Sequence, residues 1–508
     1  MPLPSPNDPL TFRRFIVAAV GAVAAVVIGI QIPDQPYVVV ALLAGFAYLL
    51  TLGVNYRWLA VAMIVTHSAA IIVPFLPGRP FLWEAFALVC WPSLIAAFLI
   101  DRHRLQKLKL DELEWYLLAS VAGYVVILVI LMLVRGVGFR VLGGGGQMGG
   151  RFYVQQIILA IVPFLMITAA PSRRTLVRAV LISYLLSVTY LISDFALAIG
   201  GERFYFLLQF FELPTDALNF YMGYEITGVR RIQSLWFVGA SLVSAVCIWM
   251  SLRDVFGRRI WAGLPLMTGG FVLGLLSGHR IALAHTAFTL LVLGFFQRFW
   301  TPLRVVAGLL SAGVAVVALY LGASALPDSV QRAVSFLPGI QVSDSASDAA
   351  WSTVRDRIEL FKMALRDMPD YWLVGRGFGM DRADEAADFN YTDNIANQYA
   401  HGLFHNGFIG TLLKTGAPGL IFTLLFFWFV SRAAVECITE VRKKSSEEWS
   451  GFDRLALLLC AQWFSLILFL YCLHGDAGVW IPTFMFPAAL VLLCRRELKQ
   501  SPIEAVSS

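Results

Sequence analysis

The residues best suited to chemistry lie in the stretch HGLFHNGFIGTLLKTGAPGL, residues 401–420. This stretch ends the longest hydrophilic segment of the chain and leads directly into a hydrophobic run. Its histidine, His405, is followed by Asn406, and an imidazole titrates near neutral pH, so it can accept a proton. Titratable residues at the edge of a membrane segment are costly to keep and are often functional. The competing interpretation is a structural histidine that caps a helix.

A second histidine, His401, lies four residues before His405, which would place both on one face of a helix. The spacing resembles part of a zinc signature, but Gly402 stands where that signature has a glutamate. No obvious third ligand accompanies the pair. We therefore expect no metal and no cofactor, and we interpret His401 as a bystander.

Arginines at the ends of other hydrophobic runs are candidate anion-binding groups. Arg280 lies in a tight hairpin between two runs. Its guanidinium either reaches the lipid headgroups or points into the bundle toward an anionic substrate. Arg230 and Arg231 stand together at the entrance of another run, where interfacial belt residues also occur.

Two further arginines lie in the long hydrophilic segment. Apolar residues with helical spacing predict an amphipathic helix over 351–368, lying on or near the membrane. Arg355 and Arg357 fall on or beside its polar face, and Pro369 is expected to stop it.

The elements that must position these residues are membrane helices. The chain of 508 residues is 58% hydrophobic and 14% charged, with a mean hydropathy of +0.73. A helix needs about 20 apolar residues to cross a bilayer, which predicts an all-α polytopic membrane protein with about 14 spans (roughly 12–14). The expected spans are 15–31, 37–53, 58–77, 81–100, 115–134, 152–170, 176–199, 233–252, 260–276, 281–297, 304–322, 402–433, 453–473 and 479–494.

The hydrophilic segment predicts three parts: a transmembrane bundle over 1–322, a partly helical outer loop over 323–401, and a C-terminal transmembrane part over 402–508. The net charge of +6 fits the positive-inside rule, because the basic clusters fall in alternate loops and at the termini. Both termini are then cytoplasmic, and His405 lies on the opposite, outer side of the membrane.

The last hydrophilic-to-hydrophobic transition contains a helix break. Residues 402–433 are too many for one untilted span, and Gly416-Ala417-Pro418-Gly419 disfavours a continuous helix. We expect a short helix bearing His405, a break, and a span from about residue 419. Non-helical backbone at that depth must be buried in protein or line a water-filled cavity, and we expect a cavity beside the histidine.

These residues form an ordered pattern that resembles the O-antigen ligase family, a superfamily that includes O-antigen and exopolysaccharide polymerases. The resemblance covers roughly 230–433, and the N-terminal half only in hydropathy. Arg280 is similar to the family's third functional position. The residues that carry the pattern are His405-Asn406, Gly416 and Gly419, and upstream Arg357-x-x-x-Phe361, Pro369 and Gly375-x-Gly377-x-Gly379.

The resemblance implies a GT-C-like membrane glycosyltransferase of lipopolysaccharide or surface polysaccharide biosynthesis. It would lie in a bacterial inner membrane, with the loop over 323–401 and His405 on the periplasmic side. Its donor would be a polyprenyl (undecaprenyl) diphosphate-linked glycan, and its acceptor a lipid A–core sugar or a growing glycan. Membrane lipids are the other partners, and no nucleic acid is expected. By resemblance, His405 is the general base, supported by Asn406, Gly416 and Gly419. The candidates for contacting the diphosphate are Arg280, Arg357, Arg355, Arg231 and Arg230.

Three functions remain open at this point. A ligase would transfer a finished glycan, and a polymerase would join repeat units with the same donor chemistry. Arg366 and Gly377 have a spacing reminiscent of some polymerases, whereas the motif at His405 favours a ligase. A transporter of lipid-linked sugars should show repeated halves with paired broken helices, and the sequence has no clear internal repeat.

Overall fold

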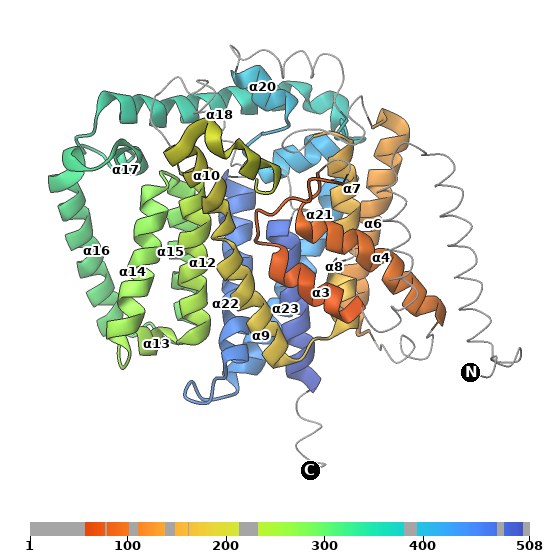
Figure 1. Ribbon diagram of the computed structural model, residues 1–508, viewed down its shortest axis with the longest axis horizontal. Coiled ribbons are helices and arrows are strands. Elements are labelled where there is room, and N and C mark those ends of the chain that lie inside the picture. The colour runs from red at the N-terminus through yellow and green to blue at the C-terminus, as the bar shows by residue number, and fades with distance from the viewer. Residues whose placement is uncertain are drawn as a thin grey trace, which may run out of the picture.

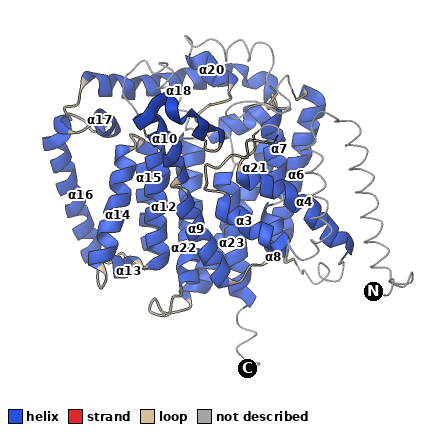
Figure 2. Ribbon diagram, in the orientation of Figure 1, coloured by secondary structure: helices blue, strands red, loops and turns tan. Residues whose placement is uncertain are grey.

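The structure of the protein is a computed structural model, which describes residues 56–76, 79–100, 110–137, 148–160, 162–212, 232–379, 394–474 and 482–500. Throughout these ranges the regular structure is helical (Figure 2), apart from two isolated bridges that pair Ile71 with Phe211 and Ile72 with Phe81. The all-α prediction is thus confirmed. The expected spans 15–31 and 37–53 lie outside the described residues.

Six helical segments of the described chain are long and apolar enough to cross a membrane. They are formed by α6 (Glu112–Arg135), α7 (Gly150–Ala160) with α8 (Val162–Ala169), α9 (Arg173–Leu186) with α10 (Thr189–Gly200), α16 (Pro302–Gly322) with η2 (Ala323–Ala325), α21 (Gly407–Arg442), and α22 (Gly451–Ser465) with the π-helix η3 (Leu466–His474).

The other helices complete the bundle and its connections. The remaining elements are α3 (Tyr56–Thr66), α4 (Leu82–Ile100), η1 (Gly201–Gln209), α12 (Gln233–Trp249), α13 (Leu252–Val255), α14 (Ile260–Leu276), α15 (Arg280–Phe296), α17 (Asp328–Val334), α18 (Asp344–Tyr371), α20 (Asn394–Ala400) and α23 (Pro482–Gln500).

One expected span is only partly helical. The run predicted over 58–77 is a helix only as far as Thr66, so the prediction for its second half is wrong. Prolines at 74, 77 and 80 cannot donate to a helix. The backbone bonds elsewhere: the N–H of Ile72 donates to the carbonyl of Phe210 at 2.7 Å, and that of Val73 to the carbonyl of Pro80 at 2.9 Å.

The centre of the bundle is formed by α21, which packs against α6, α22 and α23. The fully buried Trp463 of α22 contacts Phe426 and Phe427 of α21, with ring centroids 5.9 and 5.6 Å apart. At one end of these helices, the buried Arg495 of α23 pairs with Asp111 at 2.6 Å and Glu436 at 2.7 Å. A buried arginine needs such partners, and this network fixes α6, α21 and α23 to one another.

The long helix α18 lies across the opposite end of the bundle (Figure 1). Ser343 caps it by accepting a hydrogen bond from the N–H of Ala346. The amphipathic helix predicted over 351–368 is therefore confirmed but is longer at both ends. The expectation that Pro369 stops the helix is wrong, since the helix ends two residues later, at Tyr371. Pro369 lies in the last turn, where a proline removes only one hydrogen bond.

Candidate functional site

The helix α21 is broken at Gly416, as the sequence predicts. Gly416 has φ +68° and ψ −179°, which is not helical, and Pro418 follows within the helix. A left-handed φ is costly for residues with a β-carbon, and a β-carbon on Gly416 would also lie 2.4 Å from the carbonyl oxygen of Leu373. The first nine residues of α21 therefore form a short segment that is set off from the main span.

The segment that follows α18 fills this break. The carbonyl of Leu413 accepts from the N–H of Arg376 at 2.8 Å, and that of Lys414 accepts from the N–H of Gly377 at 2.9 Å. Buried backbone groups need such partners. A β-carbon on Gly375 would lie 2.1 Å from the carbonyl oxygen of Lys414, which explains the glycine. The break is thus covered by protein at this point, and residues 375–379 form a backbone clamp.

Replacing Gly416 tests this clamp. We expect Gly416→Ala to destabilise the protein by about 1–3 kcal/mol, because alanine would adopt a disfavoured φ against the carbonyl of Leu373. Thermal unfolding of the purified protein in detergent measures the effect. The matched control is Gly308→Ala in α16, where a β-carbon meets no atom within 4 Å and alanine favours the helix. Equal stabilities of the two variants would contradict the assigned conformation.

His405 lies in a turn, not on the helix that follows. Its φ is +50°, a rare backbone conformation for a residue with a side chain and one often found at functional positions. Its Nε2 atom lies 3.3 Å from the Oε1 atom of Gln398 in α20. Asn406 is the cap of α21, since its Oδ1 atom accepts from the N–H of Ile409 at 3.1 Å. The expected helix bearing His405 is therefore wrong by two residues, and Asn406 performs the capping.

The same turn separates the two histidines. Residues 401–406 are not helical, so His401 and His405 do not share a helical face as their spacing suggests. Within the described part of the chain, no three side chains of His, Cys, Asp or Glu are grouped so that they could hold a metal ion. The pair of His401 and His405 therefore does not form part of a metal-ligand group within the described residues.

A buried lysine, which the sequence reading did not single out, lies below the turn. Lys414 is 1% exposed. Its Nζ atom lies 5.8 Å from the ring centre of Phe404, 5.7 Å from that of Phe378 and 6.0 Å from that of Phe152. Ammonium groups are attracted to the faces of aromatic rings. Because Phe404 directly precedes His405, Lys414 connects the histidine turn to the clamp and to α7.

The inner face of α18 contacts Arg280 at one end and the His405 turn at the other. The buried residues Ala350 and Ala364 lie seven residues before and after Arg357, so the three residues share one helical face. The Nη2 atom of Arg280 donates to the carbonyl of Ala350 at 3.4 Å. At the other end, Ala364 packs against Phe404. Arg357 thus stands between the two, roughly 10 Å from each along the helix, and its Nε atom is inaccessible to solvent.

The other arginines are divided by their positions. Arg355 is exposed on α18, facing away from the bundle, and Arg230 and Arg231 lie outside the described residues. Arg332 of α17, which the sequence reading missed, is 3% exposed and donates from Nη2 to the Thr353 hydroxyl at 2.9 Å. It therefore adds a third cationic side chain beneath α18. The sequence DSVQRAV around it carries no signal for this.

A polar cluster joins α18 to α20 beside the turn. The hydroxyl of Tyr399 donates to the carboxylate of Asp367, and the guanidinium of Arg376 lies over the Tyr399 ring at 5.4 Å. Burial alone would raise the pKa of Asp367, but hydrogen bonds from Tyr399 and Arg366 hold it below its usual value. Burial and the bond to Asp367 raise the pKa of Tyr399. Asp367 is thus an ionised acceptor that fixes α20 and, through Gln398, the surroundings of His405.

These features define a helical membrane protein in which a histidine turn and a broken helix lie beneath an amphipathic cross-helix. Residues 264–424 match the family described as O-antigen ligase, and this match supports an assignment of the segment to that family. The segment includes Arg280, α18, His405 and the break at Gly416. A comparison with curated proteins finds no match to the chain. The family match supports a function of the O-antigen ligase or polymerase type.

Proposed function

We propose that the protein is a membrane glycosyltransferase that transfers a glycan from a polyprenyl diphosphate to an acceptor sugar hydroxyl, as an O-antigen ligase does. The observation that carries the proposal is the inner face of α18, along which Arg280, Arg357 and the His405 turn follow one another. Arginine side chains can stabilise an anionic leaving group, and a histidine nearby can accept the proton of a hydroxyl nucleophile. A polymerase with the same donor chemistry is the second candidate.

The proposed reaction assigns a role to each group. His405 accepts the proton of the acceptor hydroxyl as its oxygen forms a bond to the anomeric carbon of the donor. The bond between that carbon and the phosphate oxygen breaks, and the diphosphate leaves with the electron pair. Arg280 and Arg357 stabilise the negative charge that develops on it. The buried guanidinium of Arg332 adds to the positive potential at this position.

The topology belongs to the same proposal. The end of the bundle at α18 would face the periplasm, and the basic end at α13 and α23 the cytoplasm, following the positive-inside rule. The proposal also includes about 14 spans, with both termini in the cytoplasm, and a boundary of the outer loop at residues 322 and 401. It further includes a GT-C-like fold and an inner-membrane location. The transporter alternative gains no support, because transfer chemistry accounts for the cations and the histidine at one end of the bundle.

Deletion of the gene tests the function directly. If the protein is a ligase, the deletion strain should accumulate long lipid-linked chains that are not attached to an acceptor. If it is a polymerase, single repeat units should be attached in their place. Glycan extraction and gel analysis distinguish the two outcomes, with the complemented strain as the control. Normal surface glycan in the deletion strain would contradict both.

Lys414 is proposed as a positioning residue for His405. We expect Lys414→Met to lower kcat by about tenfold while leaving KM nearly unchanged, because displacing a base by about 1 Å can cost that much or more. Methionine keeps the contacts with the aromatic rings and removes the ammonium group. The melting temperature should change little, because methionine fills nearly the same volume as the lysine side chain.

Steady-state kinetics and thermal unfolding of the same preparation measure both effects. Lys443→Met is the matched control, because Lys443 lies in an exposed position beyond the end of α21 and pairs with Glu440 at 2.7 Å. If Lys414→Met transferred glycan at the normal rate, the positioning role would be wrong. A parallel loss of stability would indicate a purely structural role.

A further inference from the structure

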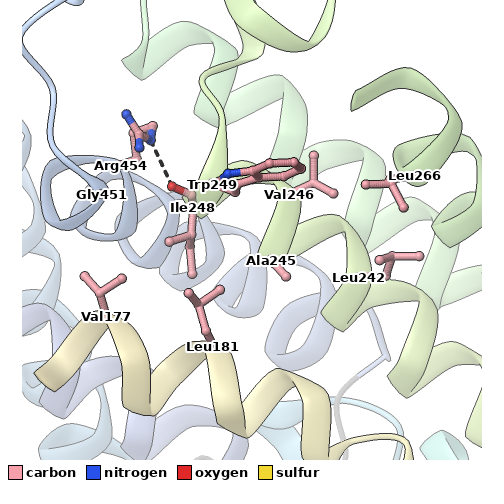
Figure 3. Close-up of a pocket in the computed structure, with 10 residues that line it drawn as sticks. All are labelled: Val177, Leu181, Leu242, Ala245, Val246, Ile248, Trp249, Leu266, Gly451 and Arg454. Atoms are coloured by element: carbon pink, nitrogen blue, oxygen red, sulfur yellow. Dashed lines mark hydrogen bonds between the residues drawn. The ribbon is translucent and has the colours of Figure 1, made fainter. Parts of the chain in front are cut away.

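An apolar crevice of about 390 Å³ lies far from the candidate site, near the basic end of the bundle. It opens between α9, α12, α14 and α22 (Figure 3). Its walls include Val177, Leu181, Leu242, Val246, Trp249 and Leu266. All of these are hydrocarbon or aromatic side chains, so the interior of the crevice suits an alkyl chain and offers little to a polar ligand.

A single charged side chain, Arg454, lines the crevice among these apolar residues. Its Nε atom donates to the carbonyl of Ile248 at 2.9 Å, and its Nη1 atom to the carbonyl of Trp449 at 2.8 Å. These bonds use two of the five N–H donors of a guanidinium. A β-carbon added at Gly451 would lie 3.9 Å from Nη2 and 3.8 Å from Val177. The Nη2 atom and Val177 thus both lie near Gly451, which also lines the crevice.

The rim of the crevice is positively charged. Arg174 and Arg178 are exposed and precede the lining residues Val177 and Leu181 by three positions, so they lie along the same side of α9. The guanidinium of Arg259 lies 6.0 Å from the centre of the Trp249 ring. These cationic side chains therefore lie next to residues that line the crevice.

The carboxylates that face Arg454 are already engaged. Asp254 accepts from the Ser251 hydroxyl at 2.6 Å and caps α13. Asp453 pairs with Lys444 at 2.7 Å and caps α22 through Ser450. Both lie at helix N-termini, where negative charge is stabilised. The opening therefore keeps an excess of positive charge.

We propose that this crevice is a binding site for an anionic phospholipid, with an acyl chain inside it and the phosphate at Arg454, Arg178 and Arg259. Basic pockets between transmembrane helices on the cytoplasmic side recognise anionic headgroups in this way. Moving an acyl chain from the bilayer into the crevice exchanges one apolar environment for another and therefore gains little hydrophobic free energy. The crevice selects an acyl chain by its shape, and the arginines select the headgroup by its charge. The site rests on the membrane setting and not on the proposed transfer reaction.

Native mass spectrometry of the delipidated full-length protein tests the site. Dioleoylphosphatidylglycerol should bind at least about fivefold more tightly than dioleoylphosphatidylcholine, whereas inorganic phosphate should not bind measurably. Arg178→Gln should reduce this preference without affecting folding, because Arg178 is exposed. Ala245→Leu should weaken the binding of both lipids, because Ala245 lines the crevice and the larger side chain would occupy it.

Arg454→Gln should abolish the preference, although the loss of its bonds to Ile248 and Trp449 also affects stability, so the other two variants decide. Lys443→Gln, which removes a charge at the same end of the bundle, is the matched control and should bind as the wild type does. Equal affinities for the two lipids, or normal binding by Ala245→Leu, would overturn the proposal.

Discussion

Replacing His405 by alanine should reduce glycan transfer by about 10²–10⁴-fold, the range expected when a general base is removed. The side chain lies in a turn with a left-handed φ, beside Gln398 at 3.3 Å, and makes no contribution to the cap of α21, which Asn406 provides. Folding and membrane insertion should therefore be preserved. Transfer from a lipid-linked donor to an acceptor, measured with purified protein in detergent or nanodiscs, gives the rate.

The matched control is His401→Ala, four residues earlier in the same turn region. It should retain most of its activity, because His401 has no role in the proposed reaction. Normal transfer by His405→Ala would remove the base from the mechanism. Equal losses in the two variants, with both proteins folded, would indicate that the turn as a whole matters and that neither imidazole acts as the base.

The sequence predicts elements well where local composition decides their structure. The spans expected at 260–276 and 281–297 agree closely with α14 and α15, because continuous apolar runs leave the backbone no alternative to helix in a membrane. The break at Gly416 is also local, since Gly-Ala-Pro-Gly disfavours helix by itself. In contrast, the end of α3 at Thr66 depends on pairing with residues near Phe210, more than 100 positions away, and hydropathy does not reveal it.

Side-chain environments are less predictable than helices. The structure distinguishes Arg357 from Arg355 only because it shows which face of α18 meets the bundle. Lys414 did have a signal, since a lysine inside an apolar run is costly and suggests function, but two of its aromatic neighbours, Phe152 and Phe378, come from distant segments. Arg332 had none: its burial depends on α17 packing beneath α18, a contact that only the folded chain brings about.

The two arginines of α18 provide the sharpest test of the diphosphate site. Arg357→Ala should lower kcat/KM by about 10²–10³-fold, the usual cost of removing a preorganised group that stabilises charge in the transition state. Arg355→Ala should change it by less than about twofold, because an exposed arginine that faces solvent or headgroups contributes little. Each variant removes one guanidinium group from α18, at positions within one turn of each other. The effects on helix propensity and net charge therefore cancel in the comparison.

Steady-state transfer assays at several donor concentrations separate binding from chemistry. A loss mainly in kcat would place Arg357 at the leaving group, where charge develops, and a loss mainly in KM would place it at donor binding. Arg357→Lys should recover only part of the activity, since an ammonium cannot form the two parallel bonds that a guanidinium makes with phosphate. If Arg355→Ala were the damaging variant instead, the inner face of α18 would not be the donor site. The proposed arrangement, in which Arg280 and Arg357 bind the diphosphate beside His405, would then be wrong.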